Sequence, residues 1–285
     1  MAEQTFDRGG EDVGNIVALE HVNVAVPDQR LATLFYIVGL GFTRDPYLMV
    51  GDDNMWVNAG GQQFHLPNRG AHVLRGHVGV VVPDLEALKA RLHRVREKLA
   101  ETRFGYSAEN GYVAATCPWG NTFRCYAPQA RFGEMTLGVP YVEFTVRRGA
   151  APGIARFYER AFGVRSALDA GRTRATVPAG PNQALVFRET DAVLPPYDGH
   201  HVAIYISDFS GPHRFLEERG LITEETTRFQ YRFRMIVDPE GGAPLFEIEH
   251  EVRSLTHPLY GRAFVNRNPA QTLRGYVRGH DAYGS

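Results

Sequence analysis

The stretch Leu19-Glu20-His21-Val22-Asn23-Val24-Ala25-Val26 has the alternating apolar pattern of a β-strand, and a similar stretch returns three more times. The other copies cover residues 77–82, 141–146 and 201–206, and they begin at His77, Tyr141 and His201. Measured from His21, successive heads lie 56, 64 and 60 residues apart, a spacing typical of one supersecondary unit per repeat. The chain is therefore predicted to contain four copies of one small module.

Each copy continues in the same order after its first strand. In module one, Pro27-Asp28 ends the strand, Asp28 is a suitable N-cap, and residues 29–38 carry apolar side chains at helical spacing. Three short strands are then predicted at 47–50, 55–58 and 62–66, between glycine-rich turns. The modules are thus predicted to be β-α-β-β-β units, and the fold class to be α+β.

Four modules fit two domains, each a pair of modules. The predicted ranges are an extension at 1–15, a first domain at 16–133 (modules 16–70 and 76–128), a second domain at 134–252 (modules 138–191 and 199–252), and a tail at 253–285. The tail contains five arginines against one acidic residue, Asp281, and shows no clean period. It is predicted to be extended, and either to pack over a domain or to mediate a homodimer.

Composition excludes several classes of partner. The chain has 285 residues, is 44% hydrophobic, and has 31 basic and 32 acidic side chains, for a formal net charge of −1. No overall field therefore favours nucleic acid or an anionic membrane. No apolar run approaches the roughly 20 residues that span a bilayer, and the first 14 residues are polar and acidic. A cytoplasmic location is expected, with Cys117 and Cys125 as reduced thiols.

Three sequence motifs accompany the modules. They are the His-Val-x-(Val/Ile)-x-(Val/Ile) first strands, the helices in which Phe35-Tyr36 precedes Leu40-Gly41 and Phe157-Tyr158 precedes Phe162-Gly163, and the turn Pro118-Trp119-Gly120-Asn121. In this combination, residues 16–251 resemble the vicinal oxygen chelate superfamily, which includes glyoxalase I, extradiol ring-cleaving dioxygenases and bleomycin-resistance proteins. The resemblance implies that paired modules curl into an open cup, with metal ligands from the head of the first strand and the middle of the last strand of each module.

By this resemblance, the first domain offers His21, His65 and His77 as metal ligands. Imidazole suits both zinc and ferrous iron. The fourth position is Arg124, whose fixed positive charge disfavours a cation nearby. Arg124 is therefore predicted to bind a substrate carboxylate, and the three histidines form the alternative metal set.

The second domain offers Tyr141, His201 and Glu247 as the preferred metal and catalytic set. Ring-cleaving relatives carry histidine at the position of Tyr141, which would complete a two-histidine, one-carboxylate triad. Tyrosine at that position is a ligand or a proton donor, and Glu143 or Glu189 is then the candidate third ligand. Alternation along the last strand places Glu247, Glu249 and Glu251 on one face.

The preferred function is that of a metal-dependent, extradiol-type dioxygenase acting on a small aromatic diol or enol-like substrate, with Fe(II) or Mn(II). One alternative is a glyoxalase-like isomerase, lyase or hydrolase that uses Zn(II) or Ni(II). The other is a metal-free binding protein of the bleomycin-resistance kind. In all three cases the partner is a small molecule, and the measured metal content separates the three.

Overall fold

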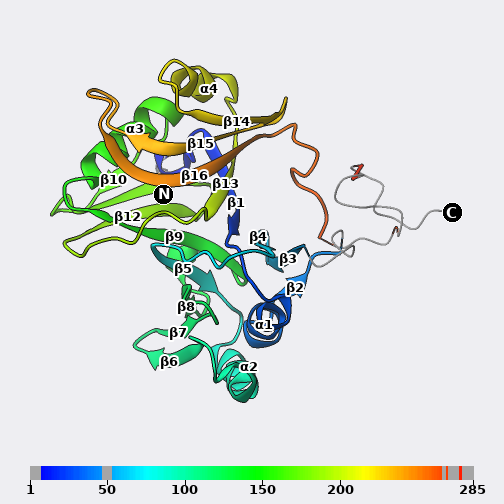
Figure 1. Ribbon diagram of the computed structural model, residues 1–285. Coiled ribbons are helices and arrows are strands. Elements are labelled where there is room, and N and C mark those ends of the chain that lie inside the picture. Colours follow the sequence, from blue (N-terminus) through cyan, green and yellow to red (C-terminus); the bar gives the residue numbers. More distant parts are fainter. Residues whose placement is uncertain (1–7, 47–52, 265–267, 269–275, 278–285) are drawn as a thin grey trace, which may run out of the picture.

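Four β-α-β-β-β modules build the chain, as seen in the computed structural model (Figure 1). The structure describes residues 8–46, 53–264, 268 and 276–277. The predicted α+β class is confirmed, since two eight-stranded sheets are accompanied by a few short helices. The strand predicted at 47–50 lies outside the described residues; β2 is a short strand just before it, at Thr43–Arg44.

The first two modules have the predicted element order. Module one consists of β1 (Ile16–Asn23), α1 (Gln29–Ala32) continued by a π-helical segment (Thr33–Gly39), β2 (Thr43–Arg44), β3 (Asn54–Ala59) and β4 (Gln62–Pro67). Module two consists of β5 (Gly76–Val81), α2 (Leu85–Val95), β6 (Gly105–Glu109), β7 (Tyr112–Thr116) and β8 (Thr122–Tyr126).

The last two modules repeat this order. Module three consists of β9 (Gly138–Arg147), α3 (Ala151–Phe162), β10 (Ala167–Leu168), β11 (Arg174–Pro178) and β12 (Ala184–Thr190). Module four consists of β13 (His201–Ile206), α4 (Ser210–Glu217), β14 (Ile222–Thr227), β15 (Gln230–Val237) and β16 (Pro244–Ser254).

Aspartates start the helices of the first two modules. Asp28 accepts hydrogen bonds from the backbone N–H groups of Arg30 and Leu31, at 2.7 and 3.0 Å. Asp84 does the same for Glu86 and Ala87, at 2.8 and 3.0 Å. These side chains satisfy N–H groups that have no partner within the helix. The chain therefore turns from strand to helix at the predicted Asp28, and in the same way at Asp84.

The sheets pair the modules differently from the prediction. One sheet has the order β14-β15-β16-β13-β1-β4-β3-β2 and joins modules one and four; the other has the order β10-β11-β12-β9-β5-β8-β7-β6 and joins modules two and three. We expected each sheet to form within 16–133 or within 134–252, and that pairing is wrong. In both sheets, the first strands of the paired modules run antiparallel, β1 beside β13 and β5 beside β9.

Helices connect the modules that the sheets separate. The π-helical segment of module one packs against α2 of module two, and α3 packs against α4 (Figure 1). Helix packing therefore holds modules one and two together, and modules three and four, while the sheets cross between these halves. As independent folding units, the ranges 16–133 and 134–252 stay a prediction.

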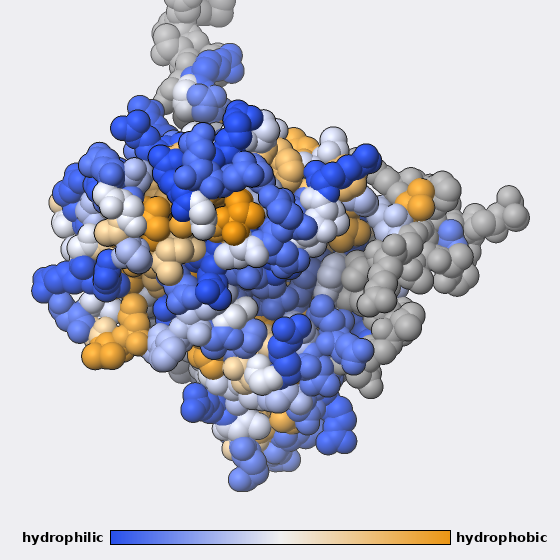
Figure 2. Space-filling model, turned by 45° about the horizontal axis from the view of Figure 1, so that its top comes forward, coloured by the Kyte–Doolittle hydropathy of each residue, from blue (hydrophilic) through white to orange (hydrophobic). Residues whose placement is uncertain are grey.

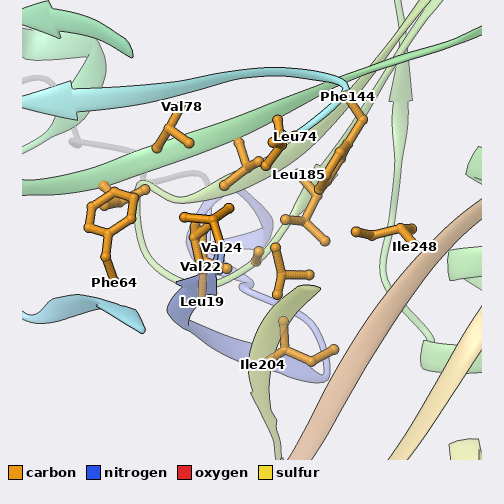
Figure 3. Packing of buried hydrophobic residues seen from close by; sticks show 14 of the residues in the cluster. Leu19, Val22, Val24, Phe64, Leu74, Val78, Phe144, Leu185, Ile204 and Ile248 are labelled. Carbon is orange, nitrogen blue, oxygen red and sulfur yellow. The ribbon is translucent and has the colours of Figure 1, made fainter. Parts of the chain in front are cut away.

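The hydrophobic core is shared by both sheets. Figure 3 shows side chains from β1 and β13 of one sheet packed close to side chains from β5, β9 and β12 of the other. Gln183 adds a polar connection, because its side chain bonds the backbone N–H and C=O of Leu19 and the C=O of Val139, at 3.1–3.2 Å. The four modules thus form one packed body.

The helices of the described residues are short. The longest, α3, has 12 residues, and no described helix combines the length and apolar character needed to cross a bilayer. On the face shown in Figure 2, hydrophilic residues predominate and hydrophobic ones lie in small separate groups.

After β16 the chain leaves module four and runs towards β2 and β3 of module one (Figure 1). The ring of Tyr260 packs on Tyr205 of β13, with 4.8 Å between centroids. Arg262 forms a buried ion pair with Asp45 and lies over the ring of Trp56. The described tail therefore packs on its own chain, and a homodimer formed through the tail stays a prediction.

Candidate metal centre

An irregularity in β1 directs two consecutive side chains to the same face. Leu19 pairs with Ile204 and His21 with Ala203, so Glu20 is an extra residue in the ladder. Such a β-bulge breaks the strict alternation of a strand. Leu19 and Val22 enter the core, while the contacts of Glu20 and His21 lie on the concave face formed by β1, β4, β13 and β16, which we call the metal cup.

Donor atoms from three strands converge in the metal cup. His21 Nε2 lies 3.4 Å from His201 Nε2, and His201 Nε2 lies 3.7 Å from Glu251 Oε2. The ligand atoms of these three residues all lie within 4.8 Å of one another. Donors around one ion lie roughly 3.0–3.4 Å apart when metal–nitrogen distances are about 2.1 Å. The arrangement is close to that of a metal site.

Two carboxylates orient the imidazoles. Glu20 contacts His21 Nδ1, and Glu249 Oε1 lies 3.4 Å from His201 Nδ1. A neutral imidazole whose Nδ1–H faces a carboxylate has its lone pair on Nε2. Both lone pairs then face each other and the Glu251 carboxylate. Three electron-rich groups repel one another in a buried cup unless a cation lies between them, so the donor set fits a metal ion.

The protonation states suit metal binding. Burial lowers the pKa of His21 well below its usual value and that of His201 to about 3. Burial opposes ionisation of Glu251, but Arg253 and its other charged neighbours outweigh burial and lower the pKa to about 2. Near neutral pH the site therefore has neutral imidazoles and an ionised carboxylate, the forms that bind metal.

Two arginines hold the carboxylates of the cup in place. Arg232 pairs with Glu249 and Glu251, and Arg253 pairs with Glu251 and with Glu20, at 2.9 Å from the latter. Carboxylates outnumber guanidinium groups in this network, which leaves excess negative charge for a divalent cation. A buried network of this kind is stable only when its charges are balanced.

His65 lies beside this triad but does not point to the same place. Its ring is stacked between those of His21 and Trp56, with 3.6 Å between centroids on each side. Its Nε2 lies 3.2 Å from Gln63 Oε1. His65 is therefore not part of the group formed by His21, His201 and Glu251, but with Glu20 and His21 it forms a second group whose donor atoms lie within 4.8 Å of one another.

The equivalent face of the other sheet differs in chemistry. We call the face formed by β5, β8, β9, β11 and β12 the arginine cup. The residues that correspond in register to His21, His65, His201 and Glu251 are His77, Arg124, Tyr141 and Val186. Tyr141 bonds His77 Nε2 at 3.1 Å and the Tyr126 hydroxyl at 2.9 Å. Among the described residues, no group in this cup has the donors for a metal.

Comparison with known proteins agrees with the fold. No protein-family model and no curated protein sequence matches the chain. Among solved structures, a Bacillus subtilis protein named "putative dioxygenase" matches with a TM-score of 0.56 and 13% identity, over 95% of this chain and 92% of that one. Glyoxalase I from Zea mays matches with a TM-score of 0.56 and 16% identity, over 83% of this chain and 92% of that one.

The chain shares the fold of these two solved structures. Within that fold, the preferred predicted site is not assembled. Tyr141 lies in the sheet of modules two and three, whereas His201 and Glu247 lie in the other sheet. Glu247 lies opposite Met235 and its carboxylate is 3.2 Å from Arg234 Nε, while His201 faces Glu249. The prediction that these three residues converge is wrong. β13 pairs with β1, and β9 pairs with β5, so Tyr141 and His201 belong to different sheets.

The other predicted ligands are also divided between the cups. His21 and His65 lie in the metal cup, but His77 lies in the arginine cup, so the alternative set is not assembled either. Glu143 forms a bidentate pair with Arg188, at 2.9 and 3.3 Å. Glu189 accepts a hydrogen bond from the N–H of Ala151 at the start of α3. These two carboxylates have structural partners far from His201.

Glu251 is the candidate ligand that sequence reasoning missed. His21 and His65 are 44 residues apart, while His201 and Glu251 are 50 residues apart. Glu247, at 46 residues, matches the spacing of module one better and lies on the same face of the strand. The only sequence signal was the group of three glutamates in 247–251. It limited the carboxylate ligand to these three residues but did not show which of them faces His201.

Proposed function

We propose that the protein is a metal-dependent enzyme whose His21, His201 and Glu251 hold one divalent ion, Fe(II) or Mn(II). The substrate class is a small aromatic diol or enol-like compound with two neighbouring oxygen atoms, and the reaction is of the dioxygenase type. The observation that carries the proposal is the convergence of two imidazole Nε2 atoms and one carboxylate in the metal cup. A two-histidine, one-carboxylate triad with open positions is typical of non-haem ferrous oxygenases.

Residues around the triad have distinct roles in this proposal. Glu20 and Glu249 keep the proton of each histidine on Nδ1, so that Nε2 stays free to bind. Arg232 and Arg253 hold Glu251 ionised and fixed in position. An ion bound there polarises substrate oxygens and lowers their pKa.

The described tail lies beside the triad, where His257 interacts with the charges of Arg253, Glu20 and Glu251. His21, His65, His201 and Glu251 are all buried. In this proposal, residues 255–262 lift to admit a substrate, and their return excludes water from the reaction.

A glyoxalase-like isomerase, lyase or hydrolase that uses Zn(II) or Ni(II) is the second candidate. His65 favours it, because a rotation of its ring away from Trp56 would bring a fourth protein donor towards the triad. Four protein donors leave fewer open positions than three do, which suits chemistry without dioxygen.

Elemental analysis combined with oxygen uptake tests the proposal. Protein purified without chelators is expected to hold close to one equivalent of iron or manganese and to consume dioxygen when supplied with catechol-type substrates. Zinc or nickel without oxygen uptake would favour the isomerase. Metal below about a tenth of an equivalent, after reconstitution with each ion, would overturn both enzyme candidates.

A further inference from the structure

The arginine cup has cationic side chains on one face of its sheet. Arg174 pairs in register with Arg188, and Thr176 with Val186. Alternate residues of a strand share a face. These side chains therefore lie on the same face of the sheet as Tyr141. Arg124 projects on the same side from β8, where its guanidinium influences the pKa of His77 and of Tyr141.

A cavity of about 490 Å³ opens on this face. Arg131 and Arg174 line it together with Glu11 and Asp12, and Phe132, Pro140 and Val186 provide apolar surface. The volume lies within the roughly 300–1,000 Å³ range of small-molecule sites, which combine apolar walls with a few polar groups. The cavity therefore has the size and lining of a ligand site.

The arginines of the cavity lack carboxylate partners. Arg188 is paired with Glu143. Arg131, in contrast, lies over the rings of Tyr126 and Phe132, at 4.6 and 4.5 Å from their centroids. Arg174 reaches only the Thr176 hydroxyl, at 3.5 Å. Across the described part of the chain, neither Arg131 nor Arg174 forms an ion pair, so both are available to an anion.

Other groups shape what the cavity accepts. The Thr176 hydroxyl lines the cavity and is free to donate its proton to an oxygen atom. Glu11 and Asp12 also line the cavity, together with a neighbouring hollow next to Gly163–Arg165. His77 is neutral near pH 7, because burial lowers its pKa to about 4. The lining therefore has two carboxylates as well as two guanidinium groups, so a carboxylate ligand must bind on the side of Arg131 and Arg174.

We propose that this cavity of the arginine cup is a metal-independent binding site for a small carboxylate with an apolar or aromatic body. Arg131 and Arg174 pair with the carboxylate, Thr176 donates a hydrogen bond to it, and Phe132, Pro140 and Val186 contact the apolar body. Arginine suits this task because its planar guanidinium matches carboxylate geometry. The site does not depend on the metal cup, so it stands or falls separately from the proposed enzyme function.

Calorimetric titration of benzoate and benzamide into chelator-treated protein tests the site. Benzoate is expected to bind with a dissociation constant of about 1 mM or lower, and benzamide, which has the same shape without the charge, at least about tenfold more weakly. Arg131→Gln and Arg174→Gln should each weaken benzoate binding about tenfold. Arg214→Gln, which changes an exposed arginine of α4 on the other sheet, is the matched control and should leave binding unchanged.

Folding of the two variants is checked by thermal unfolding, and a large effect is not expected because Arg131 is exposed and Arg174 is half-buried. Absence of benzoate binding in the wild type, equal affinity for benzamide, or an equal loss in Arg214→Gln would each overturn the proposal.

Discussion

The metal cup and the arginine cup are built from equivalent strands of the two sheets, paired in the same register, yet they have opposite chemistry. The metal cup has His21, His65, His201 and Glu251 at four equivalent positions, and the arginine cup has His77, Arg124, Tyr141 and Val186. Three changes of residue type remove the capacity to hold a cation. The comparison shows that the two sheets supply equivalent surfaces. The residue types at four positions then decide whether a cup accepts a cation or an anion.

The two cups also differ in how their charges are satisfied. In the metal cup, Arg232 is paired with Glu224, Glu249 and Glu251, and Arg253 is paired with Glu20 and Glu251. In the arginine cup, Arg131 and Arg174 have no such partners among the described residues. A network in which carboxylates outnumber guanidinium groups leaves negative charge for a cation, whereas guanidinium groups outside an ion pair attract an anion.

Replacing a histidine in each cup should give the largest contrast. His201→Ala removes a donor of the triad and is expected to reduce metal affinity by more than about a hundredfold. His77→Ala removes the histidine of the arginine cup, at the position that corresponds to His21, and should leave metal content unchanged. Metal content after dialysis is the measurement, and equal losses in the two variants would show that the cups do not differ as described.

Arg262→Ala tests the tail that packs beside the metal cup. The ion pair between Arg262 and Asp45 is buried, and the loss of one partner strands a buried charge, so the free energy of unfolding should fall by about 3 kcal/mol. Urea unfolding measures the change. Arg214→Ala, at an exposed position, is the control. A loss below about 0.5 kcal/mol in Arg262→Ala would mean that the tail does not secure the cup.

Glu20→Gln separates orientation from ligation. The bulge places Glu20 against His21 Nδ1, and an amide there no longer fixes the tautomer as firmly. Metal affinity should fall roughly 10- to 100-fold, which is less than in His201→Ala. Glu143→Gln in the arginine cup should not change it. Thermal unfolding is measured in parallel, since Glu20 also pairs with Arg253. Unchanged metal affinity in Glu20→Gln would show that Glu20 does not orient His21.

The smallest effect concerns acid stability. The pKa of His77 is about 4 in the folded protein because of burial, against about 6.5 when unfolded. Below pH 6.5 the unfolded chain binds more protons, so stability is present above that pH and is lost as the pH falls towards 4. His77→Gln should flatten this dependence by at most about 1.4 kcal/mol per pH unit, less solvent screening. Urea unfolding between pH 4.5 and 7.5 tests it, and an unchanged slope would contradict the assignment.

Much of the fold could be predicted because its signals are local. The repeated first strands, the caps at Asp28 and Asp84, and the glycine turns all act within a few residues of chain. The pairing of modules is not local. Within its own module, the first strand is hydrogen-bonded on one side only, and its other side pairs with the first strand of another module. All four first strands have a similar apolar pattern. Pairing modules one and two, or modules one and four, therefore buries equivalent surfaces, and we find no sequence signal that chooses between these pairings.

The site residues were only partly predictable for the same reason. His21, His65 and His201 were identified as candidates from their module positions, but their grouping depended on the pairing. Glu20 faces the cup only because of the bulge, which local alternation does not predict. Glu251 was not chosen because it lies 50 residues after His201, whereas His65 lies only 44 residues after His21.

Crystals soaked in Fe(II) or Mn(II), with anomalous diffraction recorded at the absorption edge of the metal, test the central claim most directly. We predict one strong peak between His21 Nε2, His201 Nε2 and Glu251, and no peak near His77 and Tyr141. A peak in the arginine cup, or no peak between modules one and four at full soaking, would contradict the account.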